Sequence, residues 1–324
     1  MMGSRLIAVL LLFVVVVNAK LTPDYYKNTC PDFQKIIRET ITNKQISTPT
    51  TAAGTLRLFM HDCFVEGCDA SVLIASNSFN TAEKDVDINQ SLAGDAFDVI
   101  TRAKVALELA CPKTVSCADI LAQATRDLVT MVGGPFYKVW LGRKDGFVSQ
   151  ASRVTGNLPT LNMTMDQILD LFQRKGFAPQ EFVAMMGAHT IGFSHCKEFT
   201  SRIFNYSNTS PHDPAMNPSY VAGLSKLCEN YTTDVTMAAF NDVMTPGKFD
   251  NMYYKNLPKG LGLLSIDQMM YTDQRTRPYV IQYANNQMAF FEAFAHVMEK
   301  LGLVDVKTGR KGEVRSRCDN FNSL

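Results

Sequence analysis

The sequence has no excess of charge of either sign. Its 324 residues include 32 Lys and Arg and 31 Asp and Glu, a formal net charge of +1. Removal of Arg5 with an N-terminal signal would leave 31 residues of each sign. Binding to nucleic acid or to a strongly anionic surface depends on a basic excess, so the composition argues against both kinds of partner.

Long apolar runs, repeats and linkers are also scarce. The apolar run Leu6–Val17 has 12 residues, fewer than the about 20 that a membrane-spanning helix needs. It precedes the small-residue pattern Val17-Asn18-Ala19, so we interpret residues 1–19 as a secretory signal peptide. No repeat, low-complexity tract or long linker divides residues 20–324, which we expect to form one domain of two lobes that are not independent. With 46% hydrophobic residues, this chain can bury a sizeable core.

Paired C-x2-C spacings, which zinc fingers use, are missing although the chain has eight cysteines. An even number of cysteines in a secreted chain argues for four disulfides. Spacing alone does not choose among the many possible pairings.

Strand patterns are few and short, and helix patterns dominate. We expect helices, in chain order, from Cys30-Pro31 to before Pro49, over Leu56–Phe64, Phe97–Cys111 and Ile120–Val132, from Thr164 to Gly176, from Pro179 to His189, and over Pro218–Leu227 and Arg277–Leu301. Ser116-x-x-Asp119 is a capping-box pattern. In the third helix the residues expected to face inward are Val99, Ile100, Ala103, Ala106, Leu107 and Ala110. A loop is expected from Ala75 to Gly94.

One stretch, Leu56–Ser71, brings reactive side chains together. On a helix, Arg57 and His61 lie at i and i+4 on the same face, with Met60 beside them. An imidazole with a pKa of about 6.5 can take and return a proton near neutral pH. A guanidinium can stabilise negative charge that develops on an oxygen. Either residue alone would be an ordinary helix face, but the whole cluster indicates an acid-base catalyst for a small oxygen-containing substrate.

Asp62 points about 100° away from that face, so it needs another role. Together with Asp69, Ser71 and carbonyls of the loop between them, it offers the hard oxygens that Ca²⁺ binds. A disulfide between Cys63 and Cys68 would hold this loop, provided that their Cα atoms come within about 7 Å. The stretch therefore predicts a calcium site.

Arg57, His61 and the Asp62–Ser71 loop together resemble the distal haem-pocket signature of the secretory plant peroxidases, the class III haem peroxidases. Gly187–Gly192, which contains His189, resembles the family's proximal haem-ligand motif, and Asp267 stands where the family's carboxylate holds that imidazole. The resemblance runs from about Leu21 to Cys318. It implies a mainly α haem-peroxidase fold whose distal and proximal lobes sandwich haem b. No C-x-x-C-H occurs, so the haem would be held non-covalently.

The resemblance also implies a role for each matching residue. His61 would take a proton from H2O2 and deliver it to the leaving oxygen, while Arg57 polarises the O–O bond. Asn89, backed by Glu83, would hold the other nitrogen of His61. Pro159 matches the donor-pocket proline. Phenolic donors would then be oxidised in one-electron steps at the haem edge.

The remaining implications concern metals, disulfides and glycans. The first calcium site would use Asp62, Val65, Gly67, Asp69 and Ser71, and the second Thr190, Asp242, Thr245, Lys248 (by its carbonyl) and Asp250. The disulfides would be Cys30–Cys111, Cys63–Cys68, Cys117–Cys318 and Cys196–Cys228. Arg143 and Asp119 resemble the family's structural ion pair. Glycosylation sequons occur at Asn89, Asn162, Asn205, Asn208 and Asn230, of which the family buries the counterpart of Asn89. His195, His212 and His296 match no role.

Some positions depart from the family pattern. Met60 replaces a Phe over the haem, where it would contact substrates, and Leu161 replaces a second proline. Asn241 stands where an aromatic residue stacks on the proximal imidazole, a role that Phe240 could take after a local shift. Such departures motivate an alternative, a cell-wall haem and calcium glycoprotein with weakened or lost peroxidase activity.

Two further classes have less support. A calcium-dependent hydrolase would need a nucleophile elbow or metalloprotease motif, which is missing, and intracellular ascorbate-type peroxidases lack a signal and disulfides. We therefore expect a monomeric enzyme, secreted to the apoplast or cell wall, that reduces H2O2 and oxidises cell-wall phenolics of the lignin or suberin type.

Overall fold

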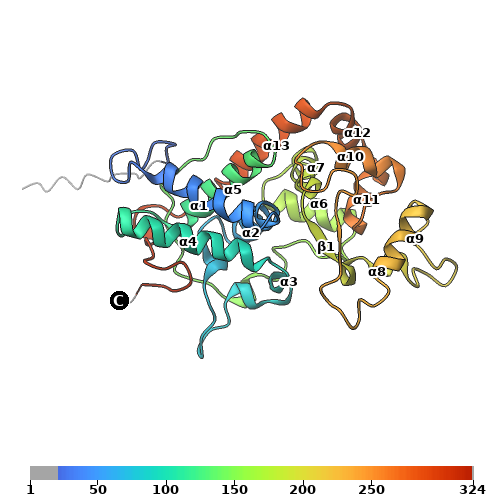
Figure 1. The fold of residues 1–324 in the computed structure, drawn as a ribbon, viewed down its shortest axis with the longest axis horizontal. Helices are drawn as coiled ribbons and strands as arrows, with labels where there is room; N and C mark the ends of the chain where they lie inside the picture. Colours follow the sequence, from blue (N-terminus) through green and yellow to red (C-terminus); the bar gives the residue numbers. More distant parts are fainter. Residues whose placement is uncertain (1–20, 323–324) are drawn as a thin grey trace, which may run out of the picture.

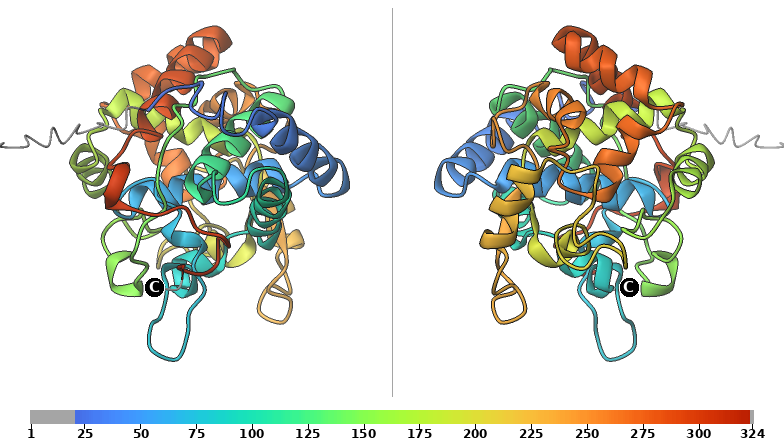
Figure 2. Two further views of the ribbon diagram at one scale, coloured as in Figure 1. Left: turned by 90° about the vertical axis from the view of Figure 1, so that its left-hand side faces the viewer. Right: turned by 90° about the vertical axis from the view of Figure 1, so that its right-hand side faces the viewer.

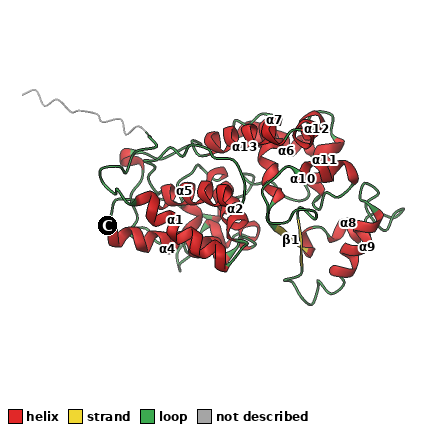
Figure 3. Cartoon of the chain, turned by 45° about the horizontal axis from the view of Figure 1, so that its top comes forward, coloured by secondary structure: helices red, strands yellow, loops and turns green. Residues whose placement is uncertain are grey.

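The computed structural model describes residues 21–322, so the expected signal peptide lies outside the described residues. Helices make up most of the structure (Figures 1 and 3). Their bounds are α1 Phe33–Ser47, α2 Thr51–Phe64, α3 Asp87–Gln90, α4 Gly94–Ala110, α5 Cys117–Met131, α6 Met165–Arg174, α7 Pro179–Met186, α8 Thr200–Ile203, α9 Pro218–Leu227, α10 Met252–Asn256, α11 Ser265–Thr272, α12 Arg277–Asn285 and α13 Gln287–Leu301. In this part of the chain no helix is long and apolar enough to span a membrane.

The strands are as short as the sequence indicates. Within residues 21–322 the only sheet pairs β1 (Phe193–His195) with β2 (Ala238–Phe240) in antiparallel fashion, with Phe193 opposite Phe240. This small sheet begins four residues after His189. It therefore shapes the backbone beside the second histidine rather than the core.

The N-terminal helices pack around α5. Helix α1 buries Phe33, Ile37 and Ile41, which recur every four residues along one face. It packs on α4 and α5, while α2 packs on the same two helices (Figure 1). The second helix of the chain is thus fixed along its length, which sets the direction of its Arg57 and His61 side chains.

Buried apolar side chains form one large core that runs from α1 to α13. A smaller cluster gathers around the Cys196–Cys228 disulfide, α8 and α9, and includes Phe199, Ile203 and Leu263. Helices α7 and α10 to α13 pack against one another, and Figure 1 shows α10, α11 and α12 on the other side of the molecule from α1 and α4.

The helix expected over Arg277–Leu301 is two helices. Asn286 has an extended backbone (φ −140°, ψ 100°) and its side chain accepts the Ala289 N–H, so it caps α13. An Asn side chain satisfies a free backbone donor at a helix start, which favours the start of a new helix at this residue. Each helix keeps a buried apolar face, with Val280 and Tyr283 in α12 and Phe290 and Phe294 in α13, so the apolar pattern continues across this break.

Other elements also differ from expectation, and α2, for example, starts at Thr51 and not at Leu56. The α-helix from Pro179 ends at Met186, and the chain continues through His189 as a tighter 3-10 turn, Gly187–Thr190. Space is short at Gly187, where a Cβ would lie 2.3 Å from the Phe290 ring. The expected loop Ala75–Gly94 contains a 3-10 turn at Glu83–Asp85 and the short helix α3.

The inward face of α4 was only partly predicted. Val99, Ile100, Ala103 and Leu107 are buried, but Ala106 is half-buried and Ala110 is exposed. Lys104 takes a buried place instead, and its ammonium donates to the Val115 carbonyl at 2.6 Å and pairs with Glu108 at 2.6 Å. A long side chain with paired charge can lie inside where a simple apolar pattern does not expect one.

The structure pairs the eight cysteines as the family resemblance implies: Cys30–Cys111, Cys63–Cys68, Cys117–Cys318 and Cys196–Cys228. The Cα atoms of Cys63 and Cys68 are 4.0 Å apart, which meets the condition set for the calcium loop. The bond from Cys117 to Cys318 fastens the C-terminal segment to the start of α5.

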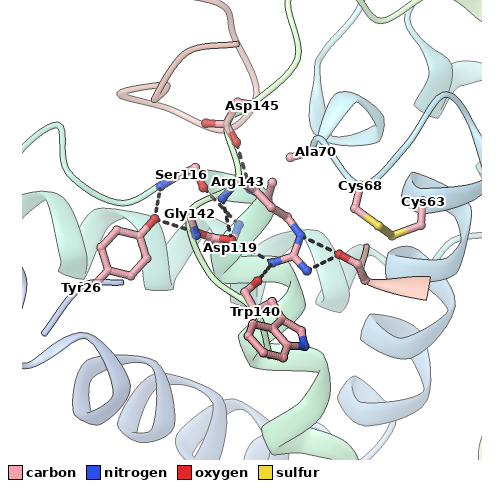
Figure 4. Close-up of polar contacts among 12 residues, drawn as sticks. Tyr26, Cys63, Cys68, Ala70, Ser116, Asp119, Trp140, Gly142, Arg143 and Asp145 are labelled. Atoms are coloured by element: carbon pink, nitrogen blue, oxygen red, sulfur yellow. Dashed lines mark hydrogen bonds and ion pairs between the residues drawn. A yellow bond between two sulfur atoms is a disulfide. The ribbon is translucent and has the colours of Figure 1, made fainter. Parts of the chain in front are cut away.

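Asp119 organises the buried start of α5 (Figure 4). The Ser116 hydroxyl accepts the Asp119 N–H at 3.2 Å and so caps the helix, but the Asp119 carboxylate makes no return bond. It pairs with Arg143 at 2.9 Å and accepts the Tyr26 hydroxyl at 2.7 Å and the Gly142 N–H at 2.6 Å. The first bond of the predicted capping box forms, but the return bond from the carboxylate does not. The prediction is wrong there because the buried Arg143 guanidinium binds the same carboxylate.

This buried ion pair predicts a large stability effect. Asp119→Ala leaves the Arg143 guanidinium buried without its carboxylate, and we expect a loss of about 3–5 kcal/mol of unfolding free energy. Guanidinium chloride unfolding with the disulfides intact measures it. The control is Asp98→Ala, which removes a half-exposed carboxylate paired with Lys44 and Arg102 and should cost no more than about 1 kcal/mol. Equal losses in the two variants would contradict a structural role for the pair.

Candidate active site

The face of α2 that carries Arg57 and His61 is turned toward the segment after His189. Ala53, Arg57 and His61 are spaced by four residues and share that face. A Cβ on Gly192 would lie 2.9 Å from the Ala53 Cβ, so the helix and this backbone are in close contact. Gly192 has φ +90°, a conformation that favours glycine. The two histidine-bearing segments thus meet along this contact.

His61 is held by an amide. Its Nδ1 lies 2.6 Å from the Asn89 Oδ1, and the Asn89 amide NH2 donates to the Glu83 carbonyl at 2.8 Å. That second bond fixes the orientation of the amide, so the atom facing His61 is an acceptor and Nδ1 must carry the proton. The Nε2 lone pair of a neutral His61 is therefore free to accept a proton.

The surroundings of His61 keep it neutral. Burial, and then the positive charge of Arg57, lower its pKa to about 3, although the bond to Asn89 opposes this shift. A neutral imidazole at ordinary pH is a base ready for use. Asn89 itself is buried, so the sequon at this position is closed to a glycan.

Arg57 is anchored beside His61 by the same segment. The side chain is exposed to solvent, yet its Nη1 donates to the Ser91 carbonyl and its Nη2 to the Ser91 hydroxyl, each at 2.9 Å. Neighbouring protein groups still desolvate the guanidinium in part, which lowers the pKa of Arg57, and the carboxylate of Glu198 opposes this effect. The charge of the Arg57 guanidinium acts on His61, so the two side chains lie near each other.

Glu83 backs Asn89, as the resemblance implies, and does so through its main chain. Its backbone carbonyl, not its carboxylate, holds Asn89. The carboxylate instead accepts the Ser71 hydroxyl at 3.1 Å, which turns it toward the expected first calcium site. The hairpin before this segment, closed by a bridge between Asn77 and Asn80, extends away from the body (Figure 2).

The second histidine is held by a carboxylate. His189 Nδ1 lies 2.8 Å from the Asp267 Oδ1, and Asp267 is fully buried at the start of α11. Burial acts to raise the pKa of Asp267, but His189 and the hydrogen bonds from Leu264 and Tyr253 outweigh it, and the pKa is lowered. An ionised partner makes the other imidazole nitrogen a stronger electron donor.

Phe240 does not take the proximal stacking role. It lies in β2 opposite Phe193 and is 52% exposed. Asn241 is buried, and its side chain accepts the Ser194 hydroxyl at 2.8 Å. The aromatic neighbour of His189 is Tyr253, whose ring meets it edge-on at 6.0 Å.

The first expected calcium site is a cluster of buried carboxylates. Asp62 and Asp69 are both buried; desolvation, and then the nearby Asp69 charge, raises the pKa of Asp62. Desolvation, followed by the charges of Asp62 and Asp69, raises the pKa of Glu83 to about 9. Asp69, Ser71 and Glu83 also line a cavity of about 150 Å³. Carboxyl groups buried this close together are costly to ionise, and a divalent cation among them would offset that cost.

The loop of this first site turns sharply. Val65 and Gly67, whose carbonyls are the other expected ligands, are buried, and Gly67 has φ +108°. A Cβ on Gly67 would lie 2.5 Å from the Asp305 carbonyl oxygen, so only glycine fits there. The Cys63–Cys68 disulfide closes the turn.

The second expected calcium site gathers its five oxygens. The Thr190 hydroxyl is 3.4 Å from the Asp242 Oδ2 and 3.4 Å from the Lys248 carbonyl. The Thr245 hydroxyl is 3.2 Å from the same Asp242 oxygen and 3.1 Å from the Asp250 Oδ1. Oxygens about 2.4 Å from one Ca²⁺ stand roughly this far apart, so the set fits the ion.

Both calcium sites would depend on neutral oxygens as well as carboxylates. No group of three or more His, Cys, Asp or Glu side chains in residues 21–322 is arranged to hold a metal. Ca²⁺ accepts hydroxyl and carbonyl ligands readily, unlike the transition metals that favour imidazole or thiolate.

Comparison with known proteins agrees with this geometry. A family model described as "Peroxidase" matches residues 34–286. Peroxidase 65 of Arabidopsis thaliana is 63% identical over 94% of this chain and 90% of its own length, and Peroxidase 41 of the same plant is 64% identical over 94% and 92%. Peroxidase 31 is 55% identical over 99% and 100%.

The chain belongs to the secretory plant peroxidase family. It has the family's mainly helical haem-peroxidase fold with four disulfides, and it is an oxidoreductase that acts on hydrogen peroxide. In this peroxidase the His189 imidazole suits a haem iron, because Asp267 engages Nδ1 and leaves Nε2 as the donor atom.

Two partners in the peroxidase site were missed from the sequence. Ser91 anchors Arg57, but in the sequence it stands out only as the last residue of the Asn89 sequon. Tyr253 donates to Asp267 at 2.8 Å, and nothing in its local pattern indicates this contact. Pro159 is half-buried in the loop before α6, and Met60 is half-buried on α2.

The surplus histidines have the structural or surface places expected of them. His212 Nδ1 contacts the Ile203 carbonyl at 2.7 Å. His296 is largely exposed, 3.6 Å from Glu181, and His195 is half-buried in β1.

The lowered pKa of His61 predicts an unusual pH profile. The rate of reaction with H2O2 should stay level from about pH 8 to pH 5 and fall only as pH approaches 3, because His61 must be neutral to accept a proton. Stopped-flow kinetics on the peroxidase measures this. A midpoint near the ordinary value of about 6.5 would contradict the assignment.

The same shift has a stability consequence of known sign. The unfolded chain binds the proton first, so His61 makes the folded state less stable as pH falls from about 6.5 toward 3. His61→Gln should reduce this acid sensitivity of the melting temperature.

Metal removal tests both expected calcium sites, each of which is a cage of oxygen ligands. Chelation should lower the melting temperature and the activity, with about 2.7 kcal/mol lost per site when calcium had been 100-fold above its dissociation constant. Calorimetry and metal analysis follow the loss. Asp242→Asn should remove one equivalent of calcium, whereas Asp24→Asn, at an exposed position, should remove none. Unchanged activity in thoroughly metal-free protein would refute the prediction.

Proposed function

We propose that this peroxidase binds one haem b non-covalently through His189, with His61 and Arg57 as the groups that act on peroxide. The observation that supports this division is the partner of each Nδ1 atom. His61 faces a neutral amide at 2.6 Å and His189 faces a carboxylate at 2.8 Å. A carboxylate strengthens the free nitrogen as a metal ligand, whereas an amide leaves it a weak base.

The proton path uses His61. Its Nε2 takes a proton from H2O2, and the resulting imidazolium returns that proton to the distal oxygen as the O–O bond breaks. A bound haem supplies the iron redox chemistry that accepts the two oxidising equivalents of peroxide. Arg57, held by Ser91, stabilises the negative charge that develops on the leaving oxygen.

The proposal also covers the electron donors, the bound calcium, the oligomeric state and the location of the enzyme. Phenolic donors of the lignin or suberin type would approach near Met60 and Pro159 and give up one electron each. Two Ca²⁺ ions would occupy the two oxygen cages. The enzyme would act as a monomer in the apoplast or cell wall, which fits exposed sequons at Asn162, Asn205, Asn208 and Asn230.

A haem and calcium glycoprotein with weakened catalysis is the second candidate. Asn241 favours it, because its buried side chain is bonded to Ser194 and leaves the proximal imidazole without the family's stacked ring. The contacts of the distal residues support the first candidate, since Nδ1 of His61 faces the Asn89 amide and Arg57 is anchored by Ser91. We therefore favour the active enzyme.

One preparation distinguishes the two. Purified protein should show a haem Soret band and oxidise guaiacol only when H2O2 is added. His61→Leu should lower the rate of reaction with peroxide by about 10²–10⁴-fold while the Soret band persists. His296→Leu, at a histidine that is largely exposed, is the matched control and should leave the rate unchanged. A Soret band without turnover in the wild type would favour the glycoprotein.

A further inference from the structure

The carboxylate that holds His189 has a second side-chain donor on the same oxygen atom. Asp267 Oδ1 lies 2.8 Å from His189 Nδ1 and also accepts the Tyr253 hydroxyl at 2.8 Å. The other oxygen, Oδ2, accepts only the Leu264 N–H, at 2.9 Å, among the described residues. The oxygen that faces the imidazole is therefore shared, while its neighbour is occupied by the backbone.

Tyr253 is built to remain a donor. It is fully buried, and desolvation, followed by the charge of Asp267, raises the pKa of its hydroxyl well above 10. The partner atom is a carboxylate oxygen, which accepts, so the Tyr253 hydroxyl is the donor of this pair. Its ring packs edge-on against His189 and at 5.1 Å against Tyr254, so its position is set by packing as well as by the bond.

The backbone of Tyr253 is tied to the second calcium cage. Helix α10 starts at Met252, whose N–H donates to the Asp250 Oδ1 at 2.8 Å. The same Asp250 oxygen accepts the Thr245 hydroxyl at 3.1 Å. Tyr253 is the next residue along the helix, so the cage that holds Asp250 also places this hydroxyl.

We propose that Tyr253 is a positioning residue that sets how strongly Asp267 draws the proton of His189. A donor on Oδ1 withdraws electron density from the oxygen that accepts the imidazole N–H, which weakens that acceptor. Tyr253 thereby limits the imidazolate character of His189 and the donor strength of its Nε2. This inference rests on the proposed role of His189 as the iron ligand.

The test compares two isosteric variants on one helix. Tyr253→Phe keeps the ring against His189 but removes the donor to Asp267. In the haem-loaded protein we expect the iron–histidine stretching band of the ferrous form to move to higher frequency. At a fixed applied potential, the ferric-to-ferrous ratio should rise by roughly tenfold, the weight of one hydrogen bond to a charged group.

Tyr254→Phe is the control. Its hydroxyl donates to the Val183 carbonyl at 2.7 Å, so this variant removes an equally buried hydroxyl that does not touch Asp267. The band and the ratio should stay at their wild-type values. Equal shifts in both variants, or none in Tyr253→Phe, would overturn the proposal.

A double variant and the wild type separate the possible failures. In Asp267→Asn protein, adding Tyr253→Phe should no longer move the ratio, because the carboxylate that Tyr253 acts on is gone; a tenfold rise there would overturn the proposal. A wild type with no iron–histidine band would refute the proposed role of His189 itself. A wild type with the band but no shift in Tyr253→Phe refutes only the role of Tyr253.

Discussion

Everything in the site depends on what each imidazole donates its Nδ1 proton to. An imidazole that faces an amide is a modest base with a free Nε2, and one that faces a buried carboxylate is an electron-rich ligand. His61 and His189 differ in this single contact, Asn89 for one and Asp267 for the other. The rest of the structure can be understood as the support that keeps each partner in place.

That support follows the same plan on both sides. Each histidine is followed directly by an expected calcium ligand, Asp62 after His61 and Thr190 after His189. On the distal side the first calcium site is linked to His61 through Glu83. The Glu83 carboxylate accepts the hydroxyl of Ser71, an expected calcium ligand, and the Glu83 carbonyl accepts the amide of Asn89. On the proximal side it runs from Asp250, which accepts the Met252 N–H, through Tyr253 to the Asp267 carboxylate. A cage that loosens would therefore disturb the orientation of an imidazole rather than stability alone, because hydrogen-bonded partners share their positions.

Residues close in sequence were the easiest to predict. The i, i+4 pair Arg57 and His61, the Asp62–Ser71 loop and most helices follow from local periodicity and spacing, and the family resemblance supplied the disulfide pairing. Contacts between distant segments were not accessible in this way: Ser91 on Arg57 and Tyr253 on Asp267 depend on how separate loops pack. The split at Asn286 was hidden because the apolar period runs through it. The capping pattern at Asp119 was misleading because Arg143, which is distant in sequence, binds its carboxylate.

The departure at Asn241 shows how a local change is absorbed. A polar side chain stands where the family pattern has an aromatic ring, and it is buried, so it needs a partner. Ser194 of β1 provides one, and the Asn241 N–H also donates to the Gly192 carbonyl at 3.1 Å. These bonds fasten the two strands to the turn after His189, at the point where Ala53 of α2 touches Gly192. His189 therefore lacks a stacked ring but has a rigid backbone. The contact left to adjust the donor strength of its imidazole is the Asp267 carboxylate, together with the groups that bind that carboxylate.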